Sequence, residues 1–202
     1  MKTYPKELIA YDENYYTDGK IYDKFAHTEG NDIFQHQGNM IVEILGDLTG
    51  KKVLDIGGGL GIFTKRLREF GADAWCQEVS KYACENSPIK EFMVCQDVGV
   101  NIPFQSDNFE LVTALESIEH IKDLDLALKE IYRVVKPNWY FYCTIGLDEG
   151  RGHYRIGSLE EWECVIEKYG FKINRGLTDE FRKHPIVKQW GWHPILLVKP
   201  CI

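Results

Sequence analysis

The stretch VLDIGGGLGIFTKRLREFGADAWCQEVS, residues 53–80, decides the fold. Its first apolar run ends beside Asp55 at a glycine-dense turn, and residues 61–71 then follow with helical periodicity. A second apolar run, residues 72–79, contains the acid Glu78 near its end. A strand, a tight turn, a helix and a second strand make a β-α-β unit, whose two strands run parallel.

The same alternation continues toward the C-terminus. Apolar runs and helical stripes alternate, the pattern of a parallel sheet with helices on both faces. Pro137 is expected to stop one helix, and Ser158 with Glu161 forms a capping box before another. Ligands of such sheets bind at the carboxyl ends of the strands. We expect further strands at residues 91–97, 109–115, 138–146, 171–177 and 194–200, and further helices at 33–48, 81–86, 123–137 and 159–170.

Composition limits the class of protein. A chain of 202 residues, 44% hydrophobic and 27% charged, is typical of one globular domain. The net charge of −7 argues against a duplex nucleic acid as substrate. Basic residues outnumber acids after residue 150, which indicates either an anionic acceptor there or a solvated surface. No apolar run is long enough to span a bilayer, so a cytoplasmic location is expected.

The cysteines and the first thirty residues carry weaker signals. No two cysteines form a C-x-x-C pair or a metal-like spacing with histidine, so we expect no metal site and reduced thiols. Residues 1–30 are rich in tyrosine and acids without a helical or strand period, and we interpret them as an arm before a domain at residues 31–202. The arm either closes over a ligand or packs elsewhere. The tyrosines that would close over the ligand are Tyr11, Tyr15, Tyr16 and Tyr22.

The glycine turn excludes two common nucleotide motifs. Neither G-x-G-x-x-G, typical of dinucleotide folds, nor the G-K-[ST] of phosphate-binding loops is present. The pattern that fits is Asp-x-Gly-x-Gly-x-Gly, formed by Asp55, Gly57, Gly59 and Gly61. An acid beside such a turn is poorly placed for a pyrophosphate and suits a ligand with a positive centre.

The sequence LDIGGGLG resembles the first motif of class I S-adenosylmethionine-dependent methyltransferases, and the resemblance runs from about residue 42 to the end. It implies a three-layer Rossmann-like fold with a mostly parallel seven-stranded sheet. It also implies S-adenosylmethionine as cofactor and S-adenosylhomocysteine as product. Glu78 then holds the ribose hydroxyls, because a carboxylate accepts several hydrogen bonds. By the same resemblance Val79, Asp97 and Val98 would lie near the adenosine, and Leu115 and Glu116 beside the methionine moiety.

Later segments extend the resemblance. FELVTALESIEHI, residues 109–121, is similar to the family's fourth-strand motif, and RVVKPNWYFYCTIG, residues 133–146, to the passage after it. Asn138 and Trp139 replace the usual glycine pair, and asparagine tolerates a left-handed turn. Residues 152–171 resemble a subset of ubiquinone-pathway and glycan-modifying methyltransferases.

Two histidines are placed near the acceptor by these motifs. His120 follows the fourth strand, and His153 lies in a glycine-rich loop after the fifth that could act as a lid. Either could be the general base that a hydroxyl acceptor needs, or a hydrogen-bonding pocket residue. Trp190 and Trp192 line the acceptor pocket or form a hairpin turn.

We therefore expect methyl transfer from S-adenosylmethionine to a small molecule, at a hydroxyl of a sugar-like or anionic metabolite. Three alternatives remain. The domain could bind the cofactor without catalysis, or methylate an amine of protein or RNA, although ALES, residues 114–117, stands where many amino-group methyltransferases have N-P-P-[YF]. The third alternative is an enzyme that uses a nicotinamide cofactor. The sequence predicts no oligomeric state.

Overall fold

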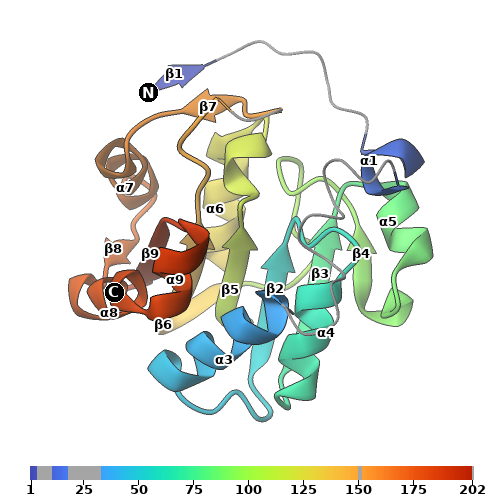
Figure 1. Ribbon diagram of the computed structural model, residues 1–202, viewed down its shortest axis with the longest axis horizontal. Helices are drawn as coiled ribbons and strands as arrows, with labels where there is room; N and C mark the ends of the chain where they lie inside the picture. Colours follow the sequence, from blue (N-terminus) through green and yellow to red (C-terminus); the bar gives the residue numbers. More distant parts are fainter. Residues whose placement is uncertain (4–10, 18–32, 150–151, 202) are drawn as a thin grey trace.

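The computed structural model describes residues 1–3, 11–17, 33–149 and 152–201. Its central sheet has seven strands in the order β4-β3-β2-β5-β6-β9-β8. All neighbours from β4 to β6 pair in parallel, whereas β9 pairs antiparallel with both β6 and β8 (Figure 1). The prediction of a mostly parallel seven-stranded sheet is confirmed. The strands are β2 (Lys52–Ile56), β3 (Asp73–Glu78), β4 (Met93–Cys95), β5 (Phe109–Leu115), β6 (Val135–Thr144), β8 (Lys172–Ile173) and β9 (Pro194–Val198).

Helices cover both faces of this sheet, as the sequence predicts. Successive side chains of a strand point to opposite faces. Val53 therefore packs in the apolar cluster under α3, α4 and α8, and Leu54 in the cluster under α6 and α7. The helices are α1 (Glu13–Thr17), α3 (Ile33–Leu45), α4 (Ile62–Glu69), α5 (Lys81–Asn86), α6 (Leu124–Val134), α7 (Leu159–Glu167), α8 (Arg175–Lys183) and α9 (Pro185–Trp190), with 3-10 turns η1 (Lys90–Phe92) and η2 (Ile118–His120).

The passage from α6 to β6 differs from the prediction. The helix ends at Val134, three residues before Pro137, and the proline lies inside β6. The ladder between β5 and β6 shifts register here: Phe109 lies opposite Val135, but Leu111 lies opposite Tyr140. A proline without an N–H is tolerated in such an irregular segment. Asn138 next to it adopts a φ of 65°, which confirms the left-handed turn expected for it.

The C-terminal region also differs. The strand predicted at residues 171–177 is wrong beyond Ile173, because Asn174 caps α8 by accepting a hydrogen bond from the N–H of Leu177. No hairpin forms around Trp190 and Trp192 either. A six-residue helix, α9, ends there, and the two indoles stack with their ring centres 6.4 Å apart against the sheet.

Other local predictions are confirmed. Ser158 and Glu161 form both hydrogen bonds of the capping box that starts α7. The first three residues add a short strand, β1 (Lys2–Thr3), which pairs with β7 (Arg155–Ile156) in a separate two-stranded sheet. Within the described ranges, no helix is both long and apolar enough to cross a membrane.

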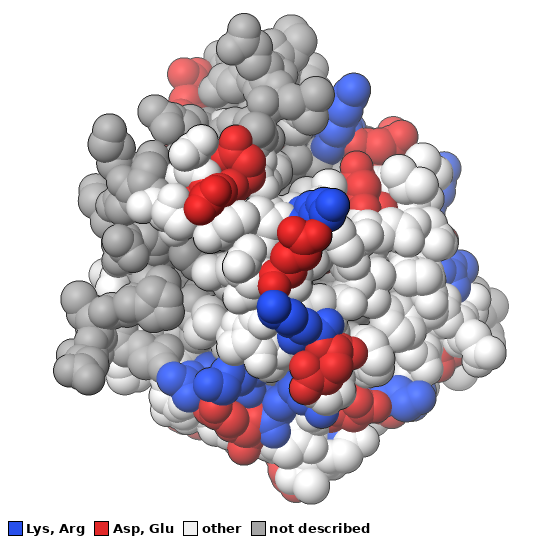
Figure 2. Space-filling model, turned by 90° about the vertical axis from the view of Figure 1, so that its right-hand side faces the viewer, with Lys and Arg blue, Asp and Glu red and all other residues white. Residues whose placement is uncertain are grey.

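The face that carries α4 and α5 mixes charges of both signs. Figure 2 shows blue and red side chains interspersed over it rather than gathered by sign. Several are ion-paired: Lys81 approaches Glu85 on α5, and Arg66 approaches Glu69 on α4. The part of this face that the structure describes therefore offers no continuous basic stripe of the kind that follows a nucleic-acid backbone.

Candidate functional site

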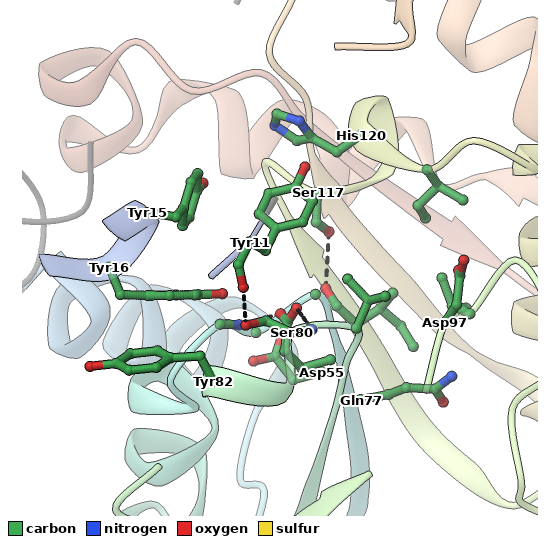
Figure 3. Close-up of a pocket in the computed structure, with 18 of the residues that line it drawn as sticks. Tyr11, Tyr15, Tyr16, Asp55, Gln77, Ser80, Tyr82, Asp97, Ser117 and His120 are labelled. Atoms are coloured by element: carbon green, nitrogen blue, oxygen red, sulfur yellow. Dashed lines mark hydrogen bonds between the residues drawn. The ribbon is translucent and has the colours of Figure 1, made fainter. Parts of the chain in front are cut away.

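A cavity of about 760 Å³ opens at the carboxyl ends of β2, β3 and β5. This is the edge of the sheet where the sequence places the ligand. Figure 3 shows Tyr11, Tyr15 and Tyr16 on one side of the cavity, His120 above it, and Gln77 and Asp97 on the other side. The glycine turn after β2 forms its floor.

The glycines of this turn serve two purposes. Gly57 has a φ of 67°, and a Cβ atom there would lie 2.7 Å from the Cβ of Ser117. Any other residue would therefore be strained and would collide with the loop after β5. Gly61, at φ 75°, caps α4. Gly57 and Gly59 border the cavity but Gly61 does not, so its contribution is to the turn and the helix start.

Asp55 lies beneath the turn. Its two carboxylate oxygens accept hydrogen bonds from the hydroxyls of Thr64 and Thr113, each at 2.8 Å. Burial raises the pKa of Asp55 to about 7, against the lowering effect of these two hydrogen bonds. These two hydrogen bonds fix the side chain beneath the turn, and the side chain also borders the cavity. That Asp55 meets a positive centre of the ligand stays a prediction.

Glu78 ends β3 and is 6% exposed. One carboxylate oxygen accepts the N–H of Gly59 and the other accepts the N–H of Ser80, both at 2.8 Å. A carboxylate has about four acceptor sites, so each oxygen retains capacity for one more hydrogen bond. Burial raises the pKa of Glu78, while the backbone hydrogen bonds lower it. This rigidly held carboxylate at the cavity wall fits the vicinal hydroxyls of a ribose.

The other predicted cofactor residues all border the cavity: Val79, Asp97, Val98, Leu115 and Glu116. Asp97 is fixed by the N–H of Gly99, which donates to its carboxylate at 2.8 Å. Val79 is 51% exposed, an unusual state for valine that leaves an apolar surface for a flat ring. Glu116 has a φ of 47°, and the surrounding protein atoms raise its pKa by desolvation.

The two predicted histidines lie against each other. Their ring centres are 4.6 Å apart and the planes are perpendicular. His120 borders the cavity, whereas His153 is buried behind it with its Nδ1 3.0 Å from the carbonyl oxygen of Asp148. Burial, and secondarily the neighbouring His153, lower the pKa of His120 to about 4. At neutral pH His120 is therefore an uncharged imidazole.

Glu119, which the sequence places on the acceptor side either near the sulfonium or in solvent, is buried and holds the neighbouring loop. Its carboxylate accepts the N–H of Gly146 at 2.8 Å, and its backbone carbonyl accepts the N–H of Tyr154 at 2.8 Å. Both ends of the loop that carries His153 are thereby fastened to η2. The side chain is fully buried, and burial raises the pKa of Glu119 to about 8. Its Oε2 has no hydrogen-bond partner among the described residues.

Glu119, His120 and His153 each present one ligand atom, and these atoms lie within 4.8 Å of one another. Imidazole nitrogens with a carboxylate are a donor set that transition metals accept. No spacing in the sequence indicates this group, because residues 119–120 and 153 meet only in the folded chain.

Tyrosines of the N-terminal region contribute a wall of the cavity. The carbonyl oxygen of Tyr11 accepts the hydroxyl of Ser80 at 2.5 Å (Figure 3). Tyr16 stacks on Tyr82 of α5 with ring centres 5.7 Å apart. Burial raises the pKa of Tyr15 and, more strongly, that of Tyr11. Tyr11, Tyr15 and Tyr16 all border the cavity, and Tyr16 also packs on α5, so the closing of these tyrosines over a ligand stays a prediction. Tyr22 lies outside the described residues.

Among the residues that the structure describes, none of the basic residues after position 150 borders this cavity. Of the described residues after position 150, only Gly152 and Tyr154 border it. Arg175 and Arg182 instead pair with the carboxylate of Glu163. The two tryptophans, Trp190 and Trp192, also lie outside the lining. Among the described residues, the basic side chains after position 150 therefore lie on the surface or in structural ion pairs. None of them borders the cavity, so they give no support to an anionic acceptor bound there.

Comparison with known proteins agrees with this geometry. Residues 54–143 match the family described as "Methyltransferase domain". The chain is 34% identical over 89 residues to the demethylmenaquinone methyltransferase of Corynebacterium urealyticum, covering 44% of this chain and 38% of the relative. It is 31% identical over 128 residues to the ubiquinone biosynthesis O-methyltransferase of Pseudomonas fluorescens, covering 57% and 53%. The chain thus spans about half or less of these relatives' length.

Solved structures share the fold at low sequence identity. The [4+2]-cyclase SpnF superposes with a TM-score of 0.66 at 17% identity, covering 88% of this chain and 87% of that one. Phosphoethanolamine N-methyltransferase 2 of Haemonchus contortus, solved with S-adenosyl-L-methionine, gives 0.64 at 20% identity, covering 98% and 62%. One architecture thus serves a cyclase and a methyltransferase, so the activity must be argued from the site.

Proposed function

We propose that this chain is a class I S-adenosylmethionine-dependent methyltransferase that transfers the cofactor's methyl group to a hydroxyl of a small molecule. Its similarity to methyltransferases over residues 54–143 supports this proposal. The observation that carries the proposal is the pairing of Glu78 with the glycine turn at one end of the cavity and the His120–His153 pair at the other. When bound, S-adenosylmethionine supplies an electrophilic methyl group on a positively charged sulfur.

The cofactor end of the cavity would be held by residues of three strand ends. Glu78 would accept from the ribose hydroxyls, and Asp97 would accept from the amino group of adenine. Val79 and Val98 would pack on the ring, and Leu115 with Glu116 would flank the methionine part. Gly57 and Gly59 support this, because they keep the floor free of side chains.

The acceptor end would be organised by His120. As an uncharged imidazole that borders the cavity, it would take the proton from an acceptor hydroxyl. Because a pKa of about 4 makes it a weaker base than a free histidine, its contribution is expected at the lower end of the usual 10²–10⁴-fold. His153 would act through His120, because it lies behind this ring and outside the lining. The remaining contribution is alignment: an acceptor held against the methyl group needs no further chemistry from the protein.

The lining favours a neutral, polyhydroxylated acceptor. Its charged groups are mainly acids, with Lys81 and Lys122 as the bases among the described residues. Carboxylates accept hydrogen bonds from hydroxyls, and the rings of Tyr11 and Tyr15 offer flat apolar faces. We therefore place a sugar-like metabolite ahead of an anionic one, and the experiment below includes both.

The direct experiment incubates the protein with methyl-tritiated S-adenosylmethionine and panels of neutral sugars, phenols and phosphorylated metabolites. Label is expected in a small molecule that survives protease and nuclease and is absent with His120→Ala. His36→Ala, an exposed position on α3, is the matched control. Label that disappears with protease or nuclease would replace the small molecule by a protein or RNA acceptor. Tight cofactor binding without transfer to any fraction would favour a non-catalytic domain.

A further inference from the structure

Two thiols meet directly beside the cofactor residue Glu78. Cys84 lies in α5 and Cys95 is the last residue of β4. The Cys84 thiol donates to the carbonyl oxygen of Glu78 at 3.8 Å, and the side chains of Cys84 and Cys95 are close enough to interact. In the parallel ladder between β3 and β4, Cys95 is the register partner of Glu78. One residue of the cofactor site is thus flanked by both cysteines.

The other four cysteines have no such arrangement. Cys76 and Cys143 are buried, and Cys164 and Cys201 are exposed on α7 and after β9. None is recorded in contact with another thiol in the part of the chain that the structure describes. Cys95 is exposed and Cys84 is partly exposed, so a small oxidant has access to the pair.

We propose that Cys84 and Cys95 form an oxidisable pair whose disulfide weakens cofactor binding, an inference that rests on the proposed function of this cavity. The oxidant is a peroxide. The thiol of Cys95 reacts with hydrogen peroxide to give a sulfenic acid and one water. The sulfur of Cys84 then attacks that sulfur, the S–S bond forms, and a second water leaves with the proton of Cys84. Two thiols and one peroxide thus give one disulfide and two waters.

The second thiol is less acidic than usual. Burial, and secondarily the contact with Cys95, raise the pKa of Cys84 to about 12. The thiolate is the reactive form in both steps, so Cys84 is a poor target for peroxide that diffuses in from solution. Its later attack on the sulfenic acid of Cys95 depends instead on the two sulfurs being neighbours. The exposed Cys95 is the position of first attack, and Cys84 is the resolving thiol.

The consequence for the cofactor follows from what α5 carries. An S–S bond of about 2.05 Å is shorter than a hydrogen-bond contact between thiols, so the disulfide would tie α5 to the end of β4 more tightly than the two thiols do. The helix is six residues long and is capped by Ser80, whose N–H donates to Glu78 and whose hydroxyl donates to the Tyr11 carbonyl. It also carries Tyr82, which stacks on Tyr16. Moving this helix disturbs the Glu78 carboxylate and the tyrosine wall together.

The test is titration of the full chain with S-adenosylhomocysteine by calorimetry before and after hydrogen peroxide, with peptide mass spectrometry of each sample. We expect a cross-linked peptide pair containing Cys84 and Cys95, an affinity reduced at least about fivefold, and recovery with dithiothreitol. Cys84→Ser and Cys95→Ser should each keep wild-type affinity after peroxide. A Cys164→Ser, Cys201→Ser double variant should respond as the wild type does.

The outcomes separate this inference from the proposed function. Reduced protein that fails to bind S-adenosylhomocysteine contradicts the proposed function. Reduced protein that binds it, but yields no Cys84–Cys95 cross-link or keeps its affinity once cross-linked, overturns the redox inference alone. An equal loss of affinity in Cys95→Ser after peroxide overturns it too, because the damage then lies at another residue.

Discussion

The imidazole rings of His120 and His153 lie edge to face, 4.6 Å between centres and 89° between planes, with only His120 bordering the cavity. In the proposed function this arrangement divides their roles: His120 would meet the acceptor, and His153 would hold the His120 ring in place. His120→Ala should lower kcat by about 10²-fold, the lower end of the usual range, and His153→Ala should lower it less. Both should leave the affinity for S-adenosylhomocysteine nearly intact, because neither side chain lies at the adenosine end. Steady-state kinetics with calorimetry gives both quantities. Undiminished turnover in His120→Ala would remove the base from the account.

A substitution of Glu78 tests the cofactor end of the cavity. Glu78→Ala should weaken binding of S-adenosylhomocysteine by about 1.5–3 kcal/mol, the usual loss when a hydrogen bond to a charged group is removed. Part of that loss comes from the N–H groups of Gly59 and Ser80, which lose their acceptor. Glu69→Ala, at an exposed acid on α4, is the control and should bind as the wild type does. Equal affinity in the two variants would show that Glu78 does not hold the ribose.

The hydrogen bonds by which Glu119 holds the loop that carries His153 lead to the next prediction. Glu119→Ala removes the acceptor for the Gly146 N–H and should lower kcat/KM for the acceptor by about tenfold, the equivalent of one such hydrogen bond. Cofactor affinity should stay unchanged. Glu119→Gln keeps an amide oxygen for Gly146 and should restore most of the activity. If Glu119→Gln is as impaired as Glu119→Ala, the carboxyl group does more than accept the N–H of Gly146, and the fastening of the loop does not explain the loss.

Asp55 should leave a signature in the pH dependence of stability. Its pKa rises from 3.8 to about 7 on folding, so the folded protein holds a proton that the unfolded chain has released between these values. The unfolded state then binds fewer protons, and the free energy of unfolding falls as pH rises through that window. Asp55→Asn lacks this titration. Urea unfolding at pH 5 and pH 8 should show a larger loss for the wild type than for the variant, and equal losses would contradict the assignment.

Much of the architecture could be predicted because its signals are local. Strand β2, the glycine turn that ends at Gly61 and helix α4 follow one another along the chain and are predicted by adjacent residues. The same holds for the capping box of α7. The placement of Glu78 at a strand end needed no knowledge of distant contacts. The local signal failed at Pro137, where a contact with a distant strand determines the structure. This proline lies in a strand because β6 changes register against β5.

The acceptor end could be predicted only in part. The motif around residues 116–120 drew attention to His120, but its contact with His153 depends on a loop more than thirty residues further along. Glu119 holds the loop that carries His153 through its carboxylate and its backbone carbonyl, which accept the N–H groups of Gly146 and Tyr154. Such contacts leave no trace in composition or periodicity. The wall formed by Tyr11 likewise depends on the hydroxyl of Ser80, from another part of the chain.

A crystal structure of the protein with S-adenosylhomocysteine tests the central claim most directly. The account predicts ligand density over the turn that contains Gly57 and Gly59, with both ribose hydroxyls within hydrogen-bond distance of the Glu78 carboxylate. Saturating ligand with this cavity empty, or with the ribose directed away from Glu78, would contradict it.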